Sequence, residues 1–535
     1  MIDQGLMALV RKHTPLMNPD ICNGIAVKYI PFSDVYIDSV FKSVSKNFPK
    51  GLEYVGFQQC SPYEELREEP KKKNDIRLVD IARSDIYLVK FLFRFNGKDL
   101  PPKYIFLPFV GEAGSIILSG SRYFISPVLS DIIISIEHDN VFVRLLRDKF
   151  SIRRTPHVML VDNKRQIVQV PWSSIYHVSK EQSGRQRTTR AKCSLMHYLL
   201  CRYGFTETFK MFTGCTPIVG INEITPAKYP ESEWIICEST KLRPSTFMNK
   251  HLYQPNLIRV AIPRSQYNPT IETMIGSFFY IIDHFPTRII PAYIDNLNIW
   301  KILMGRIYFG DSQGEGELHD VINDHIRSLD EYMDTIVVSK LKEIGYNCED
   351  IYQFFSIAIA NFNNWLISSN EKANSLYNKE LSILYDVLIS ITTSIFNFHF
   401  RLKTLVRKGL TEKELITHFN MIKSRRIFML TRSPAGVSNM SYSGDNKVLK
   451  ITTTMVPQKN NNVTGNSEDF LITDPSKLLH TSFATVGNYS NLPKSNPIGD
   501  GRVNPYQKLS DSGRVSSEIE FPEMMASIEK MIKHF

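Results

Sequence analysis

Basic side chains and amides gather in two stretches toward the C-terminal part of the chain, where they could bind an anion. Guanidinium and ammonium groups make strong, charge-assisted hydrogen bonds to phosphate, and asparagine amides can add neutral hydrogen bonds beside them. The candidate residues of the two stretches are Asn420, Lys423, Arg425, Arg426, Lys494, Asn496, Arg502 and Asn504. We predict that the cations contact phosphate or RNA and that the asparagines supply hydrogen bonds beside them. The alternative for each arginine is an ordinary salt bridge at a helix end or on the surface.

A helix and a shaped loop would have to position these residues. Thr411 and Glu414 have the spacing of a capping box, which predicts a helix that carries the basic run 423–426 near its C-terminal end, where cations suit the helix dipole. Residues 474–506 interleave proline, glycine and asparagine, which favour turns over a long helix or a central strand. We expect a docked cationic loop there, with a solvated linker as the alternative.

The N-terminal third predicts strands, and later parts predict helices. Short runs of β-branched and aromatic residues between residues 86 and 146 indicate a meandering antiparallel sheet, within which residues 111–125 form a hairpin turning at Gly120. These runs are 86–95, 104–110, 115–118, 123–128, 132–136 and 141–146. Residues 191–212 and most of 317–409 favour helices, the latter with an apolar stripe from Leu381 to Leu405 at alternating steps of three and four.

A second basic run lies between these parts of the chain. Only Glu181 opposes its five cations, which are Lys180, Arg185, Arg187, Arg190 and Lys192. The run could contact phosphates, or it could be a solvated face or a mobile arm.

The bulk properties are those of a soluble, multidomain protein without an active site of its own. The 535 residues carry a net charge of +10, which permits a polyanionic partner without requiring one. The seven cysteines form no CxxC pair and indicate buried thiols in a reducing compartment. Neither catalytic motifs nor histidine spacings suited to a metal occur, and the apolar runs are too short to span a membrane. We therefore predict no catalytic residue, no metal site and no membrane contact on this chain.

Three pieces, in this order, resemble the N-terminal half of the β subunit of cellular multisubunit RNA polymerases. The first is Glu112–Pro127, which is similar to a strand–turn–strand element of the protrusion. The second is Ile422–Ile427 followed by Ser433–Gly436, which resembles the basic run and its Gly-rich successor at the fork. The third comprises His480–Gly487 and Pro493–Gly499, which resemble the family's histidine-containing element and its Pro-Glu-Gly-Pro-Asn-Ile-Gly run. The family's glutamate is absent from the third piece, where Lys494 and Ser495 stand instead.

The resemblance implies an α+β multidomain fold, with a sheet-rich protrusion and lobe, helical segments and a loop-rich C-terminal fork region. It divides the chain into a first part of the protrusion (1–151), a lobe (152–300), a helical return to the protrusion (301–410) and a fork-like region facing nucleic acid (411–535). The eight candidate residues would then contact RNA or DNA.

The resemblance also implies the partners. A β subunit divided between chains is similar to those that jumbo bacteriophages encode, acting in the cytoplasm of the infected cell or carried in the virion. The implied function is a non-catalytic subunit of a DNA-directed RNA polymerase that lines the DNA and RNA channel and holds the RNA–DNA hybrid. A C-terminal β fragment and β′-like chains would be its partners, together with the template and transcript, and Mg²⁺ would be bound by a partner subunit. The alternatives are a structural or scaffold protein of a virus particle and a stand-alone nucleic-acid-binding protein.

Overall fold

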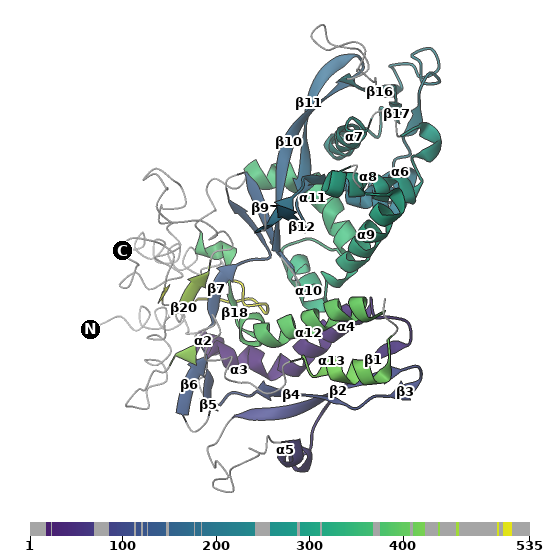
Figure 1. Ribbon diagram of the computed structural model, residues 1–535. Coiled ribbons are helices and arrows are strands. Elements are labelled where there is room, and N and C mark those ends of the chain that lie inside the picture. The colour runs from purple at the N-terminus through teal and green to yellow at the C-terminus, as the bar shows by residue number, and fades with distance from the viewer. Residues whose placement is uncertain are drawn as a thin grey trace, which may run out of the picture. The chain divides into compact units, whose positions relative to one another are not determined.

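The computed structural model divides the chain into two compact units (Figure 1). Unit 1 comprises Met1–Ile132 together with Glu371–Phe535, and unit 2 is the contiguous segment Ile133–Asn370. The residues that the structure describes are 18–22, 24–68, 85–111, 114–118, 121–125, 127–137, 139–145, 149–175, 177–182, 185–240, 257–285, 289–310, 313–367, 375–406, 410–422, 437–438, 456–459, 500–501 and 507–515. The four-part division that the resemblance implies stays a prediction.

Unit 1 combines a four-stranded antiparallel sheet with helices that cover it. Its elements before unit 2 are α2 (Pro19–Cys22), α3 (Ile25–Tyr29), α4 (Ser33–Ser45), β1 (Leu52–Gln59), α5 (Pro62–Glu68), β2 (Ile86–Phe95), β3 (Lys98–Asp99), β4 (Lys103–Pro108), β5 (Ser115–Leu118), β6 (Ser121–Ile125) and β7 (Val128–Asp131). Those after it are β18 (Lys379–Ser382), α12 (Leu384–Val406), α13 (Glu412–Phe419), β19 (Val437–Ser438), β20 (Val456–Lys459) and β21 (Asp500–Gly501). β2 is central, with β1 on one side and β3 and β4 on the other.

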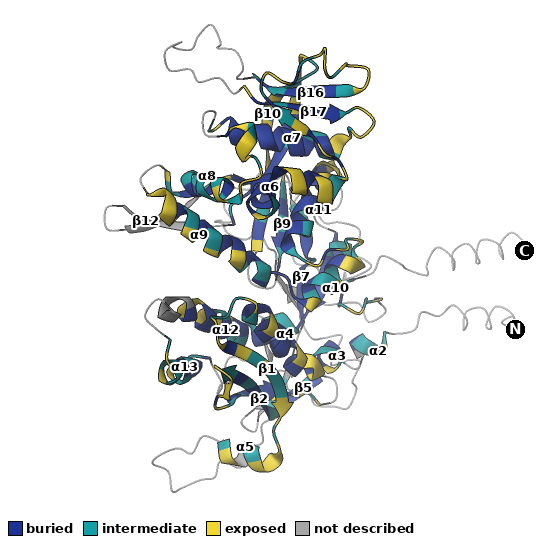
Figure 2. Ribbon diagram, turned by 90° about the vertical axis from the view of Figure 1, so that its right-hand side faces the viewer, coloured by how far each residue is buried: buried dark blue, intermediate teal, exposed yellow. Residues whose placement is uncertain are grey.

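Aromatic side chains form the core between this sheet and the helices. Phe41 of α4 is fully buried, with its ring centroid 5.0 Å from that of Phe91 and 5.3 Å from that of Phe93, both on β2. The face of α4 that carries these contacts is mostly buried, whereas α5 is largely exposed (Figure 2). Rings of this size supply much of the apolar burial that stabilises a domain.

Two smaller sheets complete unit 1 and join distant parts of the chain. One has the order β18-β7-β20-β21, and the other has the order β19-β6-β5. β18 pairs antiparallel with β7, so that Lys379 lies opposite Asp131. The side chains of these two residues form an ion pair and are 5% and 9% exposed.

Unit 2 is built on an eight-stranded sheet covered by helices. Its strands are β8 (Ile134–Glu137), β9 (Asn140–Arg144), β10 (Lys149–Val161), β11 (Lys164–Ser173), β12 (His177–Gln182), β13 (Arg185–Arg190), β14 (Cys193–Ser194), β15 (Ile218–Gly220), β16 (Trp234–Ser239) and β17 (Arg259–Pro263). Its helices are α6 (Leu195–Thr213), α7 (Pro269–Ile282), α8 (Leu297–Phe309), α9 (Glu315–Ser328), α10 (Thr335–Glu343) and α11 (Ile351–Ile367). The strands of the main sheet have the order β14-β11-β10-β16-β17-β15. β9 also pairs with β10, and β8 pairs with β9, which completes the eight strands. Phe205, Phe278 and Trp300 pack together among α6, α7 and α8, and all three are fully buried.

The fold class is α+β, as the sequence predicts, but the predicted single sheet over residues 86–146 is wrong. Its strands belong to four separate sheets. β6 pairs with β19, β7 pairs with β18, and β9 pairs with β10, so each of these strands pairs with one outside residues 86–146. The predicted hairpin is confirmed by the pairing of β5 with β6, whereas Gly120 lies outside the described residues. The helical stripe is also one turn too long. Leu381 belongs to strand β18, where it lies opposite Leu129, and tertiary pairing overrides its helix propensity.

Candidate nucleic-acid interface

Helix α13 leads the chain into the first candidate stretch. Thr411 and Glu414 form the predicted capping box, in which each side chain binds the other residue's backbone N–H. The helix is fixed by Phe419, whose ring centroid lies 4.6 Å from that of Phe93 on β2 and 4.9 Å from that of Phe398 on α12. It ends at Phe419, so its last turn contains His418 rather than the basic run that the sequence places there.

Asn420 is the candidate residue that the structure describes. It is exposed at the C-cap of α13, and it lines a hollow of about 200 Å³ together with Ile416 and Phe419 of the same helix. The residues that complete the lining are Glu68, Pro101, Pro102, Lys103, Tyr104 and Phe106. Thus α5, β4 and the segment before β4 form the other walls of the hollow.

The hollow suits hydrogen bonding better than the binding of phosphate. The amide of Asn420 can donate and accept, and burial raises the pKa of Tyr104, so that its hydroxyl keeps its proton. Lys103 supplies a cation, but the carboxylate of Glu68 lines the same space and would repel an anion. The arrangement fits an uncharged group that offers both donors and acceptors.

The other seven candidate residues, Lys423, Arg425, Arg426, Lys494, Asn496, Arg502 and Asn504, lie outside the described residues. The structure does describe the points at which the chain enters and leaves their region. Ile422, directly before Lys423, is fully buried. Strand β21, directly before Arg502, pairs with β20, and β20 pairs in parallel with β7.

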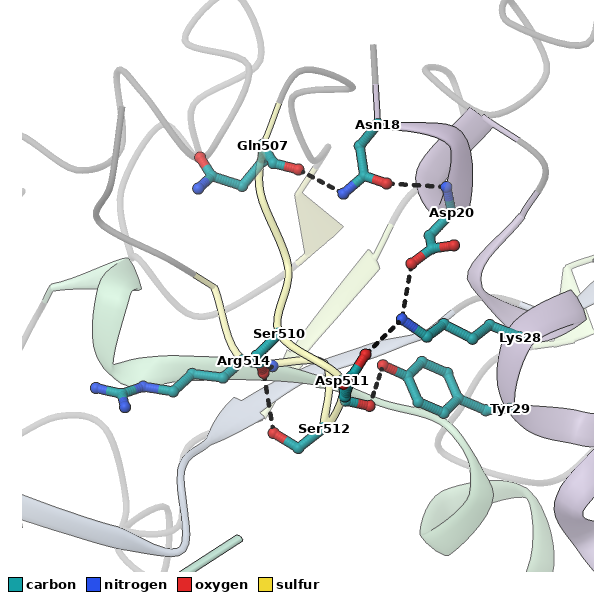
Figure 3. A network of polar contacts seen from close by, with 9 residues as sticks. All are labelled: Asn18, Asp20, Lys28, Tyr29, Gln507, Ser510, Asp511, Ser512 and Arg514. Carbon is teal, nitrogen blue, oxygen red and sulfur yellow. Dashed lines mark hydrogen bonds and ion pairs between the residues drawn. The ribbon is translucent and has the colours of Figure 1, made fainter. Parts of the chain in front are cut away.

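The segment Gln507–Val515 anchors the chain just after Asn504 (Figure 3). The Asn18 side chain donates to the carbonyl oxygen of Gln507 at 2.9 Å, and the Tyr29 hydroxyl donates to that of Asp511 at 3.1 Å. Lys28 lies between two carboxylates, 2.8 Å from Asp20 and 3.5 Å from Asp511. The hydrogen bond to Asp20 raises the pKa of Lys28. These contacts attach the segment to α2, α3 and the residues beside them.

The same segment is also hydrogen-bonded to β18. The amide of Leu381 donates to the carbonyl of Gly513 at 2.8 Å, and the amide of Val515 donates to that of Lys379 at 3.1 Å. Gly513 has a φ of +86°, and a Cβ there would lie 2.6 Å from the carbonyl oxygen of Leu381. Only glycine fits this backbone conformation so close to another strand. Both ends of the region that holds the seven candidates are therefore fixed to unit 1.

Sequence reasoning missed these anchoring residues and the far walls of the hollow. Asn18 and Gln507 are 489 residues apart, and no local pattern marks either as the partner of the other. Pro101 and Pro102 mark a break between strands, but nothing in their spacing points to Asn420.

Comparison with known protein families bears on which of the predicted functions this chain has. A family model described as "Non-virion RNA polymerase subunit" matches residues 8–531. The chain belongs to this family. No curated protein matches the chain. Membership in the non-virion RNA polymerase subunit family favours transcription over the two alternatives, a scaffold of the virus particle and a stand-alone nucleic-acid-binding protein.

The described residues of this RNA polymerase subunit also bear on its chemistry. Burial raises the pKa of all six thiols whose side chains are described, for example Cys193 to about 12 and Cys348 to about 11. A protonated thiol is a poor nucleophile, so these cysteines are suited to packing rather than to covalent chemistry. Among the residues described, no group of three or more His, Cys, Asp or Glu side chains could hold a metal ion. None of the helices searched in the described part of the chain has the length and apolar character needed to cross a membrane.

Proposed function

We propose that this RNA polymerase subunit is a non-catalytic fragment equivalent to the N-terminal half of a β subunit. It lines the DNA and RNA channel and holds the RNA–DNA hybrid during transcription in the cytoplasm of a cell infected by a bacteriophage. A C-terminal β fragment and β′-like chains are its partners. The Mg²⁺ ions that promote nucleotidyl transfer belong to one of those chains.

The observation that carries the proposal is the pairing, within unit 1, of strands that lie in the first piece or directly follow each of the three pieces that resemble a β subunit. β5 and β6 lie in the first piece, and β19, which directly follows the second piece, pairs with β6 so that Val437 lies opposite Ile125. β7 directly follows the first piece. β20 pairs with both β7 and β21, and β21 directly follows the third piece. Strands spread over nearly 400 positions of the chain thus meet in two small sheets of one unit.

The fixed ends of the candidate region support the same function. A surface that holds nucleic acid needs its cations on elements that do not move away under load. Buried Ile422 and the docked segment Gln507–Val515 provide such attachment on either side of the candidate residues. The hollow beside Asn420 adds a hydrogen-bonding site at the entrance to this region.

The first test is purification of the complex from infected cells through a tag on this chain. We expect partner chains to co-purify, one of them carrying the Asp-Phe-Asp-Gly-Asp sequence, and the complex to extend an RNA primer on DNA when Mg²⁺ is present. Recovery of capsid or tail proteins without RNA synthesis would refute the proposal.

The second test separates nucleic-acid contact from assembly. We expect Arg425→Ala/Arg426→Ala to shorten the lifetime of the stalled transcript complex while partner recovery stays unchanged, because phosphate contacts hold the transcript. Lys50→Ala/Lys413→Ala is the matched control, since it removes two exposed cations from the same unit. Equal loss of partners and transcript in the arginine variant would show that the pair is structural.

A further inference from the structure

The basic run near residue 185, which the proposed function leaves unused, forms a separate hairpin in unit 2. β12 and β13 pair antiparallel over six residue pairs, from His177 opposite Arg190 to Gln182 opposite Arg185. They form a two-stranded sheet of their own, and in the sequence they lie between β11 and β14, which pair with each other in the main sheet.

The register of the hairpin sorts its charges by face. Opposite residues of an antiparallel pair lie on the same face, and faces alternate along each strand. Lys180 pairs with Arg187, and Arg185 stands two positions before Arg187 on the same strand. By register, these three positions therefore belong to one face of the hairpin. Glu181, the acidic residue of the run, pairs with Gln186 and lies on the other face.

The base of the hairpin is fixed to the main sheet and extends its positive charge. Trp172 pairs with Ser194, and the hydroxyl of Ser174 donates to the carbonyl of Ala191 at 2.9 Å, which closes the two strands where they leave the sheet. The Lys192 ammonium lies 5.0 Å from the centroid of the Trp172 ring, and the Arg153 guanidinium carbon lies 5.9 Å from it. Two exposed cations, Arg153 and Lys192, therefore stand at the foot of the hairpin.

Two other exposed cations of unit 2 form ion pairs with nearby carboxylates. Arg154 lies 2.9 Å from Asp139, and Arg264 lies 2.7 Å from Asp162. The face that holds Lys180, Arg185 and Arg187 has no acidic residue of the hairpin on it. Its remaining members, Val178, Gln182 and Thr189, are uncharged, so the face presents a local excess of positive charge.

We propose that the β12–β13 hairpin is a second nucleic-acid contact of this subunit, in which the face of Lys180, Arg185 and Arg187 holds a phosphodiester backbone. The proposal rests on the proposed function, because it takes the template or transcript of the polymerase as the polyanion. Backbone contact of this kind does not depend on base sequence, and it weakens steeply with salt. The hairpin then holds nucleic acid through unit 2, independently of the fork-like region in unit 1.

The test measures the salt dependence of nucleic-acid binding by the tagged, assembled polymerase. Each lost contact with duplex DNA lowers the slope of log affinity against log salt by about 0.9. We therefore expect Lys180→Ala/Arg185→Ala/Arg187→Ala to lower the slope by about 2.7. Between 50 and 200 mM salt, the variant should lose about 40-fold less affinity than the unaltered enzyme. Duplex DNA and single-stranded RNA of equal length are the two probes, and the one whose slope changes identifies the bound backbone.

Two further sets of variants keep the test decisive. Lys164→Ala/Arg165→Ala/Lys210→Ala removes the same charge from exposed positions elsewhere in unit 2 and should leave the slope unchanged. Arg185→Lys/Arg187→Lys keeps the charge and should also leave it unchanged. A photoreactive benzoylphenylalanine in place of Gln182 should cross-link to the nucleic acid, whereas one in place of Gln186, on the opposite face, should not.

Several results would overturn the proposal. Equal slopes for the hairpin variant and its matched control would show that the cations do not touch phosphate. Loss of a partner chain from the hairpin variant, with cross-links to that chain, would make the hairpin a subunit contact. If the unaltered complex synthesised no RNA, the proposed function would fail, and the cross-linking comparison would still report whether the hairpin binds nucleic acid.

Discussion

Replacement of Gly513 by alanine tests whether the docked segment Gln507–Val515 holds the end of the candidate region in place. A side chain at a left-handed position costs about 1–2 kcal/mol in backbone strain. At Gly513 the added Cβ would also lie 2.6 Å from the carbonyl oxygen of Leu381, so the two strands must separate. Separation weakens the backbone hydrogen bonds Leu381–Gly513 and Val515–Lys379, each of which contributes about 0.5–1.5 kcal/mol.

Gly97 supplies the matched control for this substitution. Its φ of +79° carries a similar backbone cost, but nothing lies within 4 Å of the Cβ that alanine would add. The difference between Gly513→Ala and Gly97→Ala therefore isolates the loss of docking, which we put at about 2 kcal/mol from the two hydrogen bonds. A difference of that size corresponds to roughly 30-fold in the local opening equilibrium.

Hydrogen exchange read at single amides is the assay, because stability in a chain of two units differs from place to place. We expect the Leu381 and Val515 amides to exchange roughly 30-fold faster in Gly513→Ala than in Gly97→Ala. The stalled transcript complex should also dissociate faster in Gly513→Ala, because Arg502 and Asn504 lie just before the loosened segment. Equal protection of Leu381 in the two variants would refute the reasoning.

Three more perturbations test other parts of the structure. Lys379→Met should destabilise unit 1 by about 3–5 kcal/mol in chemical unfolding because it removes the ammonium that pairs with the buried Asp131 carboxylate. Asp131→Leu/Lys379→Met should recover most of the loss, and equal stability of the two variants would contradict this. Burial raises the pKa of Cys60 to about 11. The rate of its alkylation, followed by mass spectrometry, should therefore rise about tenfold per pH unit from pH 7 to 10, whereas in the unfolded protein the rate levels off near pH 9. A plateau at pH 9 in the folded protein would count against burial. Thr411→Ala should cost α13 about 1 kcal/mol and speed amide exchange at Glu414, and Thr411→Ser should restore it; unchanged exchange in Thr411→Ala would show that the capping box does not hold the helix end.

Local chemistry was readable from the sequence, whereas the choice of distant partners was not. β2 runs from Ile86 to Phe95 as predicted, because alternation of β-branched and aromatic residues is a property of neighbouring positions. The capping box of α13 was predictable for the same reason. The pairing of β7 with β18 depends on which buried strand edges meet after the chain has left unit 1 and returned, and no short window of sequence contains that information.

The candidate site follows the same distinction. Its residue types predicted contact with an anion. Asn420 stands exposed beside a hollow, but the hollow is completed by Tyr104 and Glu68, more than 300 positions away. The roles of Lys423, Arg425, Arg426, Lys494, Asn496, Arg502 and Asn504 stay predictions. The basic hairpin could be divided into a cationic and a mixed face only when the register of β12 and β13 was available.

The insertion of unit 2 between β7 and β18 sets the order in which a ribosome can complete this subunit. Asp131 must wait for Lys379, 248 residues later, which at roughly 5–20 residues per second takes about 12–50 s. Unit 2 is contiguous, and its synthesis occupies almost all of that interval. Throughout it, β7 lacks its antiparallel neighbour and presents a strand edge on which other chains can add. The speed of translation through residues 133–370 should therefore influence the yield of soluble subunit, even where codon changes leave every amino acid the same.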